Sequence, residues 1–169
     1  MPVEYVVLNQ GTLVLELWTG TISHDELLAH ERRHLRDSSI ACGASVLADA
    51  IGASFETMPG AVHELTDLYR QSAENLRVGK AAILVNESTY DRARLYEKQV
   101  IDLGVRMILF NTLDVACAWL GIDVTAARKE LAQLQGHISH VEAHGADLGG
   151  GEPTLQRKNQ GVTDEEFRR

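Results

Sequence analysis

Residues 81–85 read AAILV, five apolar residues in succession, and this short run decides the fold class. A strand without polar alternation is typical of a parallel sheet that helices cover on both faces. Working outward, residues 45–49 and 105–110 form two further apolar runs, and each of the three runs is followed by a segment with helical spacing. Repeated strand–helix units predict an α/β fold with right-handed crossovers.

Two more apolar runs open the chain, at residues 3–8 and 12–18, and Asn9-Gln10-Gly11 separates them. An Asn- and Gly-bearing turn between two short strands predicts a β-hairpin. In the second run, leucines at alternate positions share one face of the strand. Ser23 and Glu26 then form a capping box that starts a helix reaching about residue 37. The chain therefore predicts a mixed β-sheet: an N-terminal hairpin, then βα units with helices packed on the sheet.

Four later helices are expected from their start signals. Pro59 suits the first turn of one, and Ser88 with Asp91 caps the next. Asn111 and Asp114 cap a short helix that Gly121 ends, and one more begins at residue 123. The proposed domain is residues 3–122, followed by an additional C-terminal helix at 123–144 and a flexible polar tail at 145–169.

Composition limits the classes of function. The chain has 169 residues, 44% of them hydrophobic, which suits a single domain with an ordinary core. Its formal net charge of −8 disfavours nucleic acid and anionic membrane surfaces as partners. The two cysteines have no metal-like spacing, and no run approaches the roughly 18 apolar residues of a membrane span. We expect a cytoplasmic protein without a cofactor.

The segment at residues 46–65, VLADAIGASFETMPGAVHEL, resembles the strand–loop–helix of STAS domains, the anti-sigma-factor antagonists. Asp49 and Phe55 stand in matching positions, and residues 57–60 occupy the place of the family's Asp-Ser-Ser-Gly. Residues 110–114 and Trp119-Leu120-Gly121 are similar to the ending of the SpoIIAA-like branch, small bacterial proteins. The resemblance covers about residues 3–122 and implies a STAS-like fold.

The chain departs from the family at the phosphorylated serine. Met58 and Pro59 stand where the antagonists have Ser-Ser, and neither can accept phosphate. Thr57 is better explained as a helix cap than as a phosphoacceptor. The resemblance implies a non-enzymatic regulatory or protein-interaction module without the inherited phosphorylation switch.

Loops at the carboxyl ends of parallel strands form the usual ligand rim of an open α/β sheet. Helix N-termini at such a rim offer free N–H groups to an anion, although these side chains also serve as caps. The candidate ligand-binding residues at this rim are Asp49, Ser54, Thr57, Ser88, Asn111 and Thr112.

The sharpest motif is His30-Glu31-Arg32-Arg33-His34, which matches the H-E-x-x-H pattern of zinc hydrolases. Two histidines one helical turn apart can hold a metal, and the Glu can act as a general base. Against this, two arginines lie between the Glu and the second His, and the sequence suggests no third ligand. Helical geometry places Glu31 toward the sheet and the two histidines toward its rim. The alternative to a metal site is an amphipathic helix with a solvated His/Arg face.

Three alternative functions follow. The motif at residues 30–34 can also be explained without any function, as the solvated face of an amphipathic helix. The first is the interaction module just described. The second is a metal-dependent hydrolase using His30, His34 and Glu31. The third is a carrier of an apolar ligand or lipid, which predicts an apolar cavity between helices and sheet.

The C-terminal helix carries an apolar stripe that must cover either its own sheet or a second copy of the chain, which motivates a homodimer hypothesis. The stripe is Ala127, Leu131, Leu134, Ile138 and Val141.

Overall fold

The computed structural model describes residues 3–56, 61–72 and 78–145. These residues form one five-stranded sheet in the order β1-β2-β3-β4-β5. β1 (Val3–Leu8) is antiparallel to β2 (Leu13–Ile22). β2 is parallel to β3 (Ala44–Phe55), which is parallel to β4 (Val78–Leu84), which is parallel to β5 (Arg106–Phe110). The mixed sheet with an N-terminal hairpin is confirmed.

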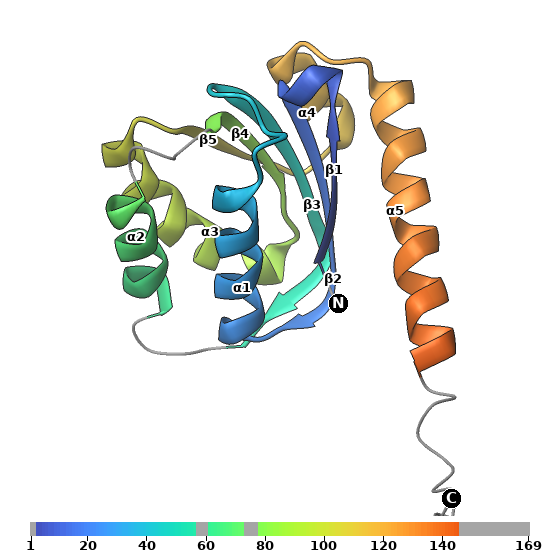
Figure 1. The fold of residues 1–169 in the computed structure, drawn as a ribbon, viewed down its shortest axis with the longest axis horizontal. Helices are drawn as coiled ribbons and strands as arrows, with labels where there is room; N and C mark the ends of the chain where they lie inside the picture. Colours follow the sequence, from blue (N-terminus) through green and yellow to red (C-terminus); the bar gives the residue numbers. More distant parts are fainter. Residues whose placement is uncertain (1–2, 57–60, 73–77, 146–169) are drawn as a thin grey trace, which may run out of the picture.

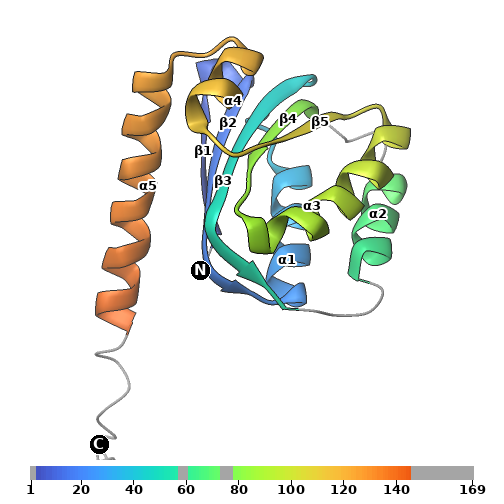
Figure 2. The ribbon, with the colours of Figure 1, turned by 180° about the vertical axis from the view of Figure 1, so that it is seen from behind.

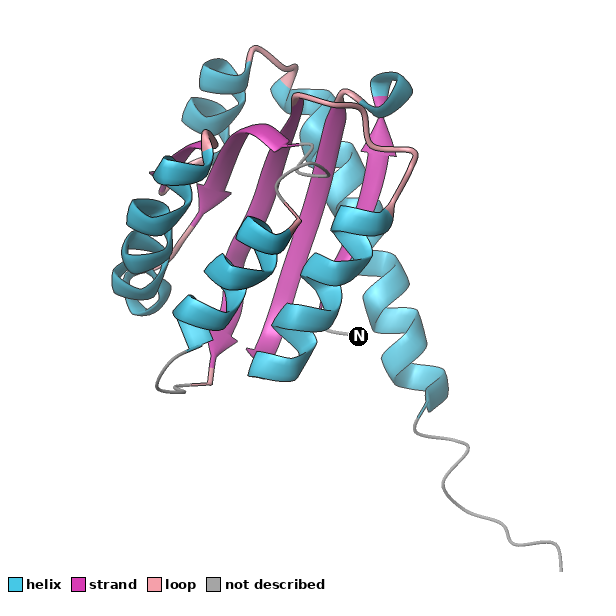
Figure 3. Cartoon of the chain, turned by 60° about the vertical axis from the view of Figure 1, so that its left-hand side comes forward, coloured by secondary structure: helices cyan, strands magenta, loops and turns pink. Residues whose placement is uncertain are grey.

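Helices cover both faces of this sheet (Figures 1 and 2). The crossover helices α1 (His24–Arg36), α2 (Ala61–Gln71) and α3 (Glu87–Val100) lie together on one face, in front of the strands in Figure 3. Crossovers of one hand require this when the strand order advances in one direction. The last two helices, α4 (Leu113–Leu120) and α5 (Val124–Gly145), lie on the opposite face. Short 3-10 turns occur at Asn9–Gly11 and Ile101–Leu103.

Because the sheet is covered twice, β2 is buried on both of its faces. Val14 and Trp18 pack with the core under α1 to α3, and Leu15 packs with the core under α4. The predicted alternation holds for Leu13, Leu15 and Leu17, but the other face is buried as well. β2 also continues beyond the predicted run at 12–18, through Gly20 to Ile22.

Two other strands differ from expectation. β3 is more than twice as long as the predicted run at 45–49, so Asp49 and Ser54 lie inside the strand and not in a loop. A β-bulge interrupts it: between the pairs Leu17–Asp49 and Thr19–Gly52, one residue of β2 faces two of β3. β5 is the edge of the sheet, and Ile108 is exposed there. The prediction that this strand is buried on both faces is therefore wrong.

The capping prediction is confirmed for α1 and wrong for α3 and α4; the N-cap of α4 is Thr112 and not Asn111. Ser23 and Glu26 form the expected capping box of α1. For α3 the cap is Asn86, whose side chain accepts from the Thr89 backbone N–H at 3.0 Å, and not Ser88. The Ser88 hydroxyl instead donates to the Asn86 side chain. A cap two residues earlier starts the helix earlier, which shortens the loop after β4.

The apolar stripe of α5 packs on the chain's own sheet. Leu131, Leu134 and Ile138 form a buried cluster with Leu17 of β2, and Val6 of β1 packs against it. In Figures 1 and 2 the helix runs beside β1 and β2. As far as Ile138 the stripe therefore needs no second copy to cover it, and the homodimer through this helix stays a prediction.

A candidate ligand-binding cavity

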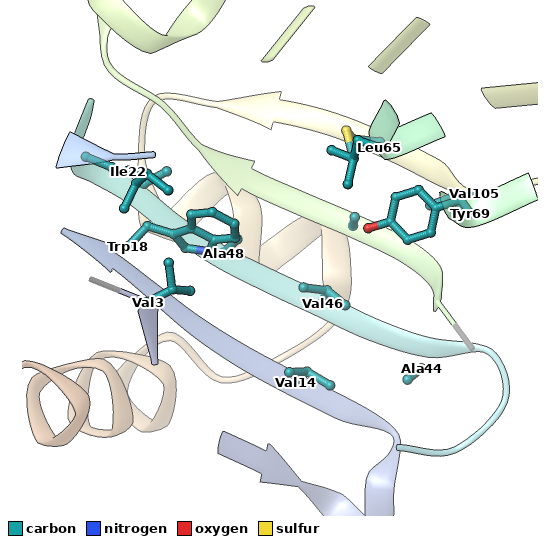
Figure 4. Close-up of a cluster of buried hydrophobic side chains, with 14 of the residues drawn as sticks. Val3, Val14, Trp18, Ile22, Ala44, Val46, Ala48, Leu65, Tyr69 and Val105 are labelled. Carbon is teal, nitrogen blue, oxygen red and sulfur yellow. The ribbon is translucent and has the colours of Figure 1, made fainter. Parts of the chain in front are cut away.

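A cavity of about 140 Å³ lies between the sheet and the helices α1, α2 and α3. Its floor is made by small and branched residues of the parallel strands, among them Val46, Ala48 and Ala81. Aromatic side chains close its sides: Trp18 lies over β3 beside Ala48, and Tyr69 enters from α2 (Figure 4). Alanines on the strands leave the space that larger residues would fill. An apolar cavity between helices and sheet was the structural expectation of the carrier alternative.

Five polar side chains gather at this cavity or directly behind it. We call Glu16, His30, Glu31, His34 and Tyr69 the polar cluster. Glu16 comes from the middle of β2, and Tyr69 comes from α2. The other three lie on α1 at positions 30, 31 and 34, on the side of the helix that faces the sheet. All five are less than a tenth exposed, an unusual concentration of buried polar groups.

Glu16 is the centre of the polar cluster. One oxygen, Oε2, accepts a hydrogen bond of 3.0 Å from the Trp18 indole N–H. The other, Oε1, lies 3.4 Å from Nε2 of both His30 and His34. Burial by itself would raise the pKa of Glu16, but the nearby charges of His30 and His34 lower it to about 2. Glu16 is therefore a buried carboxylate that stays ionised.

Glu31 behaves in the opposite way. Burial raises the pKa of its carboxyl group, and its nearest partner is neutral, the Tyr69 hydroxyl that donates to Oε2. The same burial, with the nearby Glu31 charge, raises the pKa of Tyr69 well above its ordinary value. Two carboxyl groups in one cluster thus differ in their preferred charge, because only Glu16 faces the histidines closely.

His30 and His34 face the core, which corrects the prediction of a solvated face. Their rings stack with centroids 5.9 Å apart, and the edge of each meets the Tyr5 ring. Both are buried, and Nε2 of each lacks a hydrogen-bond partner among the described residues, since 3.4 Å exceeds a direct bond. Glu31 does point toward the sheet, as the helical geometry predicted. The motif was thus placed correctly for Glu31 and wrongly for the two histidines.

The metal-binding prediction gains no support from this arrangement. Glu16 is the acid nearest to both histidines, yet among the described residues no three His, Cys, Asp or Glu side chains are placed to hold a metal ion. A hydrolase site would also need an open coordination position beside a substrate cleft. The metal-dependent hydrolase stays a prediction.

Of the candidate residues at the strand ends, those that the structure describes do not line the cavity, and most of them have structural roles. Asp49 accepts from the Ile51 backbone N–H at 3.1 Å and so supports the β-bulge. Ser54 pairs with Thr21 across two strands at 3.1 Å. Asn111 is exposed, and Thr112 caps α4 without a side-chain bond. Thr57 lies outside the described residues; ligand binding by this set stays a prediction.

Cys117 and His137 lie away from the cavity. Cys117 is buried against the sheet under α4, and burial raises its pKa. His137 is exposed on α5, while the side chains of His140 and His144 lie outside the described part. In that part, none of the helices combines the length and apolarity that crossing a bilayer demands.

Comparisons with known proteins concern the fold. No protein-family model matches the chain, and no curated protein matches it. An uncharacterized DUF3478-family protein with a SpoIIAA-like fold from Shewanella loihica is similar, with 11% identity and a TM-score of 0.47, covering 70% of this chain and 93% of that one. The unphosphorylated anti-sigma factor antagonist SpoIIAA is similar too, with 15% identity and a TM-score of 0.41, covering 70% and 96%.

The chain is similar to SpoIIAA-like proteins in fold. The predicted STAS-like resemblance is confirmed at that level. At such low identity the likeness concerns the fold alone, so the function has to be argued from this chain's own side chains.

Sequence reasoning missed the two residues that complete the cluster, Glu16 and Tyr69. A signal for Glu16 was present, because it is the one charged residue in the apolar stretch at 13–18. The alternating leucines placed Glu16 on the other face of the strand, and the sequence did not show that this face is buried too. Tyr69 gave no signal, since it fits the apolar stripe of α2, and only the packing of α2 against α1 brings its hydroxyl to Glu31.

Proposed function

We propose that this chain is a non-enzymatic binding module that takes up one small, mainly apolar molecule in the cavity between the sheet and α1 to α3. The observation that carries the proposal is the cavity itself, about 140 Å³ with a largely apolar lining. In other proteins, an apolar cavity of about 150 Å³ takes up benzene. The ligand would therefore be of the size of a single ring and not of a whole lipid.

The position of the cavity supports binding over bond-making. The groups that line it pair with each other: Glu16 faces the histidines, and Glu31 accepts from Tyr69. A nucleophile with its own activating base would be needed for covalent catalysis. Within the described residues, Cys117 lies on the other face of the sheet, under α4.

A regulatory role through protein contact, implied by the resemblance to STAS domains, is compatible with this proposal. The α1 helix supplies both cavity residues and an outer surface with Arg32 and Arg36. A ligand under α1 would act on that surface through the position of the helix. Neither a protein partner nor a homodimer follows from the cavity, and both stay proposals.

Toluene is a suitable probe for the proposal. Titration of the full chain, followed by amide NMR shifts, should show saturable binding with the largest shifts at cavity residues. Ala93→Leu on α3 should weaken toluene binding at least tenfold, because Ala93 lines the cavity and the added carbons fill it.

Ala118→Leu is the matched control, the same substitution at an exposed site of α4 on the opposite face. It should bind toluene as the unmodified chain does. Absence of saturable toluene binding, or equal effects of the two substitutions, would refute the proposal.

A further inference from the structure

The lining of the cavity is polar mainly in two places. One is the polar cluster, of which Glu16, Glu31, His34 and Tyr69 line the cavity. The other is the rim near the start of α1, where His24 pairs with Glu64 at 2.6 Å. Between them the surface is apolar. A ligand with an apolar body and one polar group could therefore place that group at either end.

His34 lines the cavity and has unused hydrogen-bonding capacity. It is 6% exposed, and its Nε2, although 3.4 Å from Glu16 Oε1, forms no hydrogen bond among the described residues. Buried polar atoms nearly always have a partner. The imidazole nitrogen donates in one tautomer and accepts in the other, so a group that does both would satisfy either form.

The neighbouring groups disfavour a charged ligand. The Glu16 carboxylate already has Trp18 at one oxygen and the two histidines at the other, so an ammonium group would have to displace them. A carboxylate ligand would meet two carboxyl groups, Glu16 and Glu31. Burying an unpaired charge here would oppose binding strongly.

We propose that the cavity selects a neutral single-ring molecule with one hydroxyl group, the ring lying on the apolar floor and the hydroxyl bonded to His34 beside the Glu31–Tyr69 pair. This inference rests on the proposed function and adds the chemical class of the ligand. A hydroxyl both donates and accepts, which matches the imidazole in either tautomer.

Calorimetric titration of the full chain at pH 7 with four probes of one shape tests the inference. The probes are toluene, p-cresol, p-toluate and 4-methylbenzylamine. We expect p-cresol to bind at least tenfold tighter than toluene, and both ions to bind at least tenfold more weakly than p-cresol. If toluene binds and p-cresol gains nothing over it, or an ion binds tightest, this inference fails while the proposed function stands.

Two histidine variants locate the hydroxyl. His34→Leu should bring p-cresol down to the affinity of toluene and leave toluene binding unchanged. The control is His137→Leu, the same change at an exposed histidine of α5 on the opposite face, which should keep the preference for p-cresol. Retention of the preference in His34→Leu, or its loss in both variants alike, would overturn the proposal.

A measurement on the unmodified chain covers the case in which His34→Leu does not fold. In long-range ¹H–¹⁵N spectra, p-cresol should shift the Nε2 resonance of His34 and toluene should not. Equal shifts with the two probes would mean that His34 does not meet the hydroxyl.

Discussion

At the scale of the residue, Glu16 shows how one side chain organises a site. It lies in the middle of a buried strand, where an isolated carboxylate would be too costly to keep ionised. The indole N–H of Trp18 and the imidazoles of His30 and His34 offset that cost. The consequence is a polar cluster whose charges depend on each other.

The pKa of His30 gives a testable pH dependence. Burial lowers this pKa, but the charge of Glu16 outweighs burial, so the net pKa is raised above 6.5. The folded chain then holds a proton that the unfolded chain releases, and the free energy of unfolding should fall as pH rises above about 6.5. Burial also raises the pKa of Glu31, which acts in the same direction from about pH 4.5 upward. Glu31→Gln removes this second contribution.

Urea denaturation from pH 5 to 8.5 should therefore be compared between Glu31→Gln and the double variant Glu16→Gln/Glu31→Gln. Without Glu16, burial dominates and the pKa of His30 falls below 6.5, so the free energy of unfolding should rise with pH up to about 6.5. The added Glu16→Gln should also cost about 3 kcal/mol at pH 6. Equal slopes in the two variants would mean that Glu16 does not control His30.

At the scale of the element, the β-bulge in β3 and the start of α3 form one unit. Asp49 accepts from the Ile51 N–H inside the bulge, and the Asn86 side chain donates to the Ile51 carbonyl at 2.7 Å. The same Asn86 caps α3. One residue thus ties a helix N-terminus to an irregular strand, and it fixes where α3 crosses the sheet over the cavity.

Two alanine substitutions separate the observed cap from the one predicted from sequence. Asn86→Ala should lower the free energy of unfolding by about 1–2 kcal/mol, because it removes the cap and the bond to Ile51. Ser88→Ala removes only a bond to the capping side chain and should cost about 0.5 kcal/mol or less. Chemical denaturation checks both, and a larger loss in Ser88→Ala would restore Ser88 as the cap.

At the scale of the whole molecule, the sheet is the middle of three layers, and the two outer layers have different tasks. The helices α1 to α3 leave a cavity above the sheet, whereas α4 and α5 close the other face with buried side chains. Packing of α4 and α5 stabilises the strands, whose other face is only partly filled by side chains. Stability and binding are therefore expected to reside on opposite faces.

Leu134→Ala tests the contribution of the closed face. Leu134 is 6% exposed and packs in the cluster with Leu17, so the substitution should cost about 2–4 kcal/mol in chemical denaturation. Leu95→Ala, at a residue 56% exposed on α3, is the matched control and should cost about 0.5 kcal/mol or less. A small loss in Leu134→Ala would mean that α5 does not stabilise the domain, and would reopen the question of a second copy as its partner.

Local signals carried most of the fold prediction. Apolar runs such as 81–85 and the capping box at Ser23 gave the order of elements correctly, because both depend on neighbours in the chain. The errors concern features that depend on segments far apart in the chain. β5 is an edge strand and is therefore partly exposed, and β3 is longer than predicted because it pairs with β2 along its length. Strand ends depend on the partner strand, which a local pattern does not contain.

By itself, the sequence determined the class of fold, the sequence of its elements and the inward orientation of Glu31, since periodicity and capping act within a few residues. Only the tertiary structure decided the candidate site. Glu16, His34 and Tyr69 come from a strand and two different helices, and their positions far apart in the chain say nothing of their proximity. Packing of α1 and α2 on the sheet brought them together, and alanines in the strands below left the space beside them.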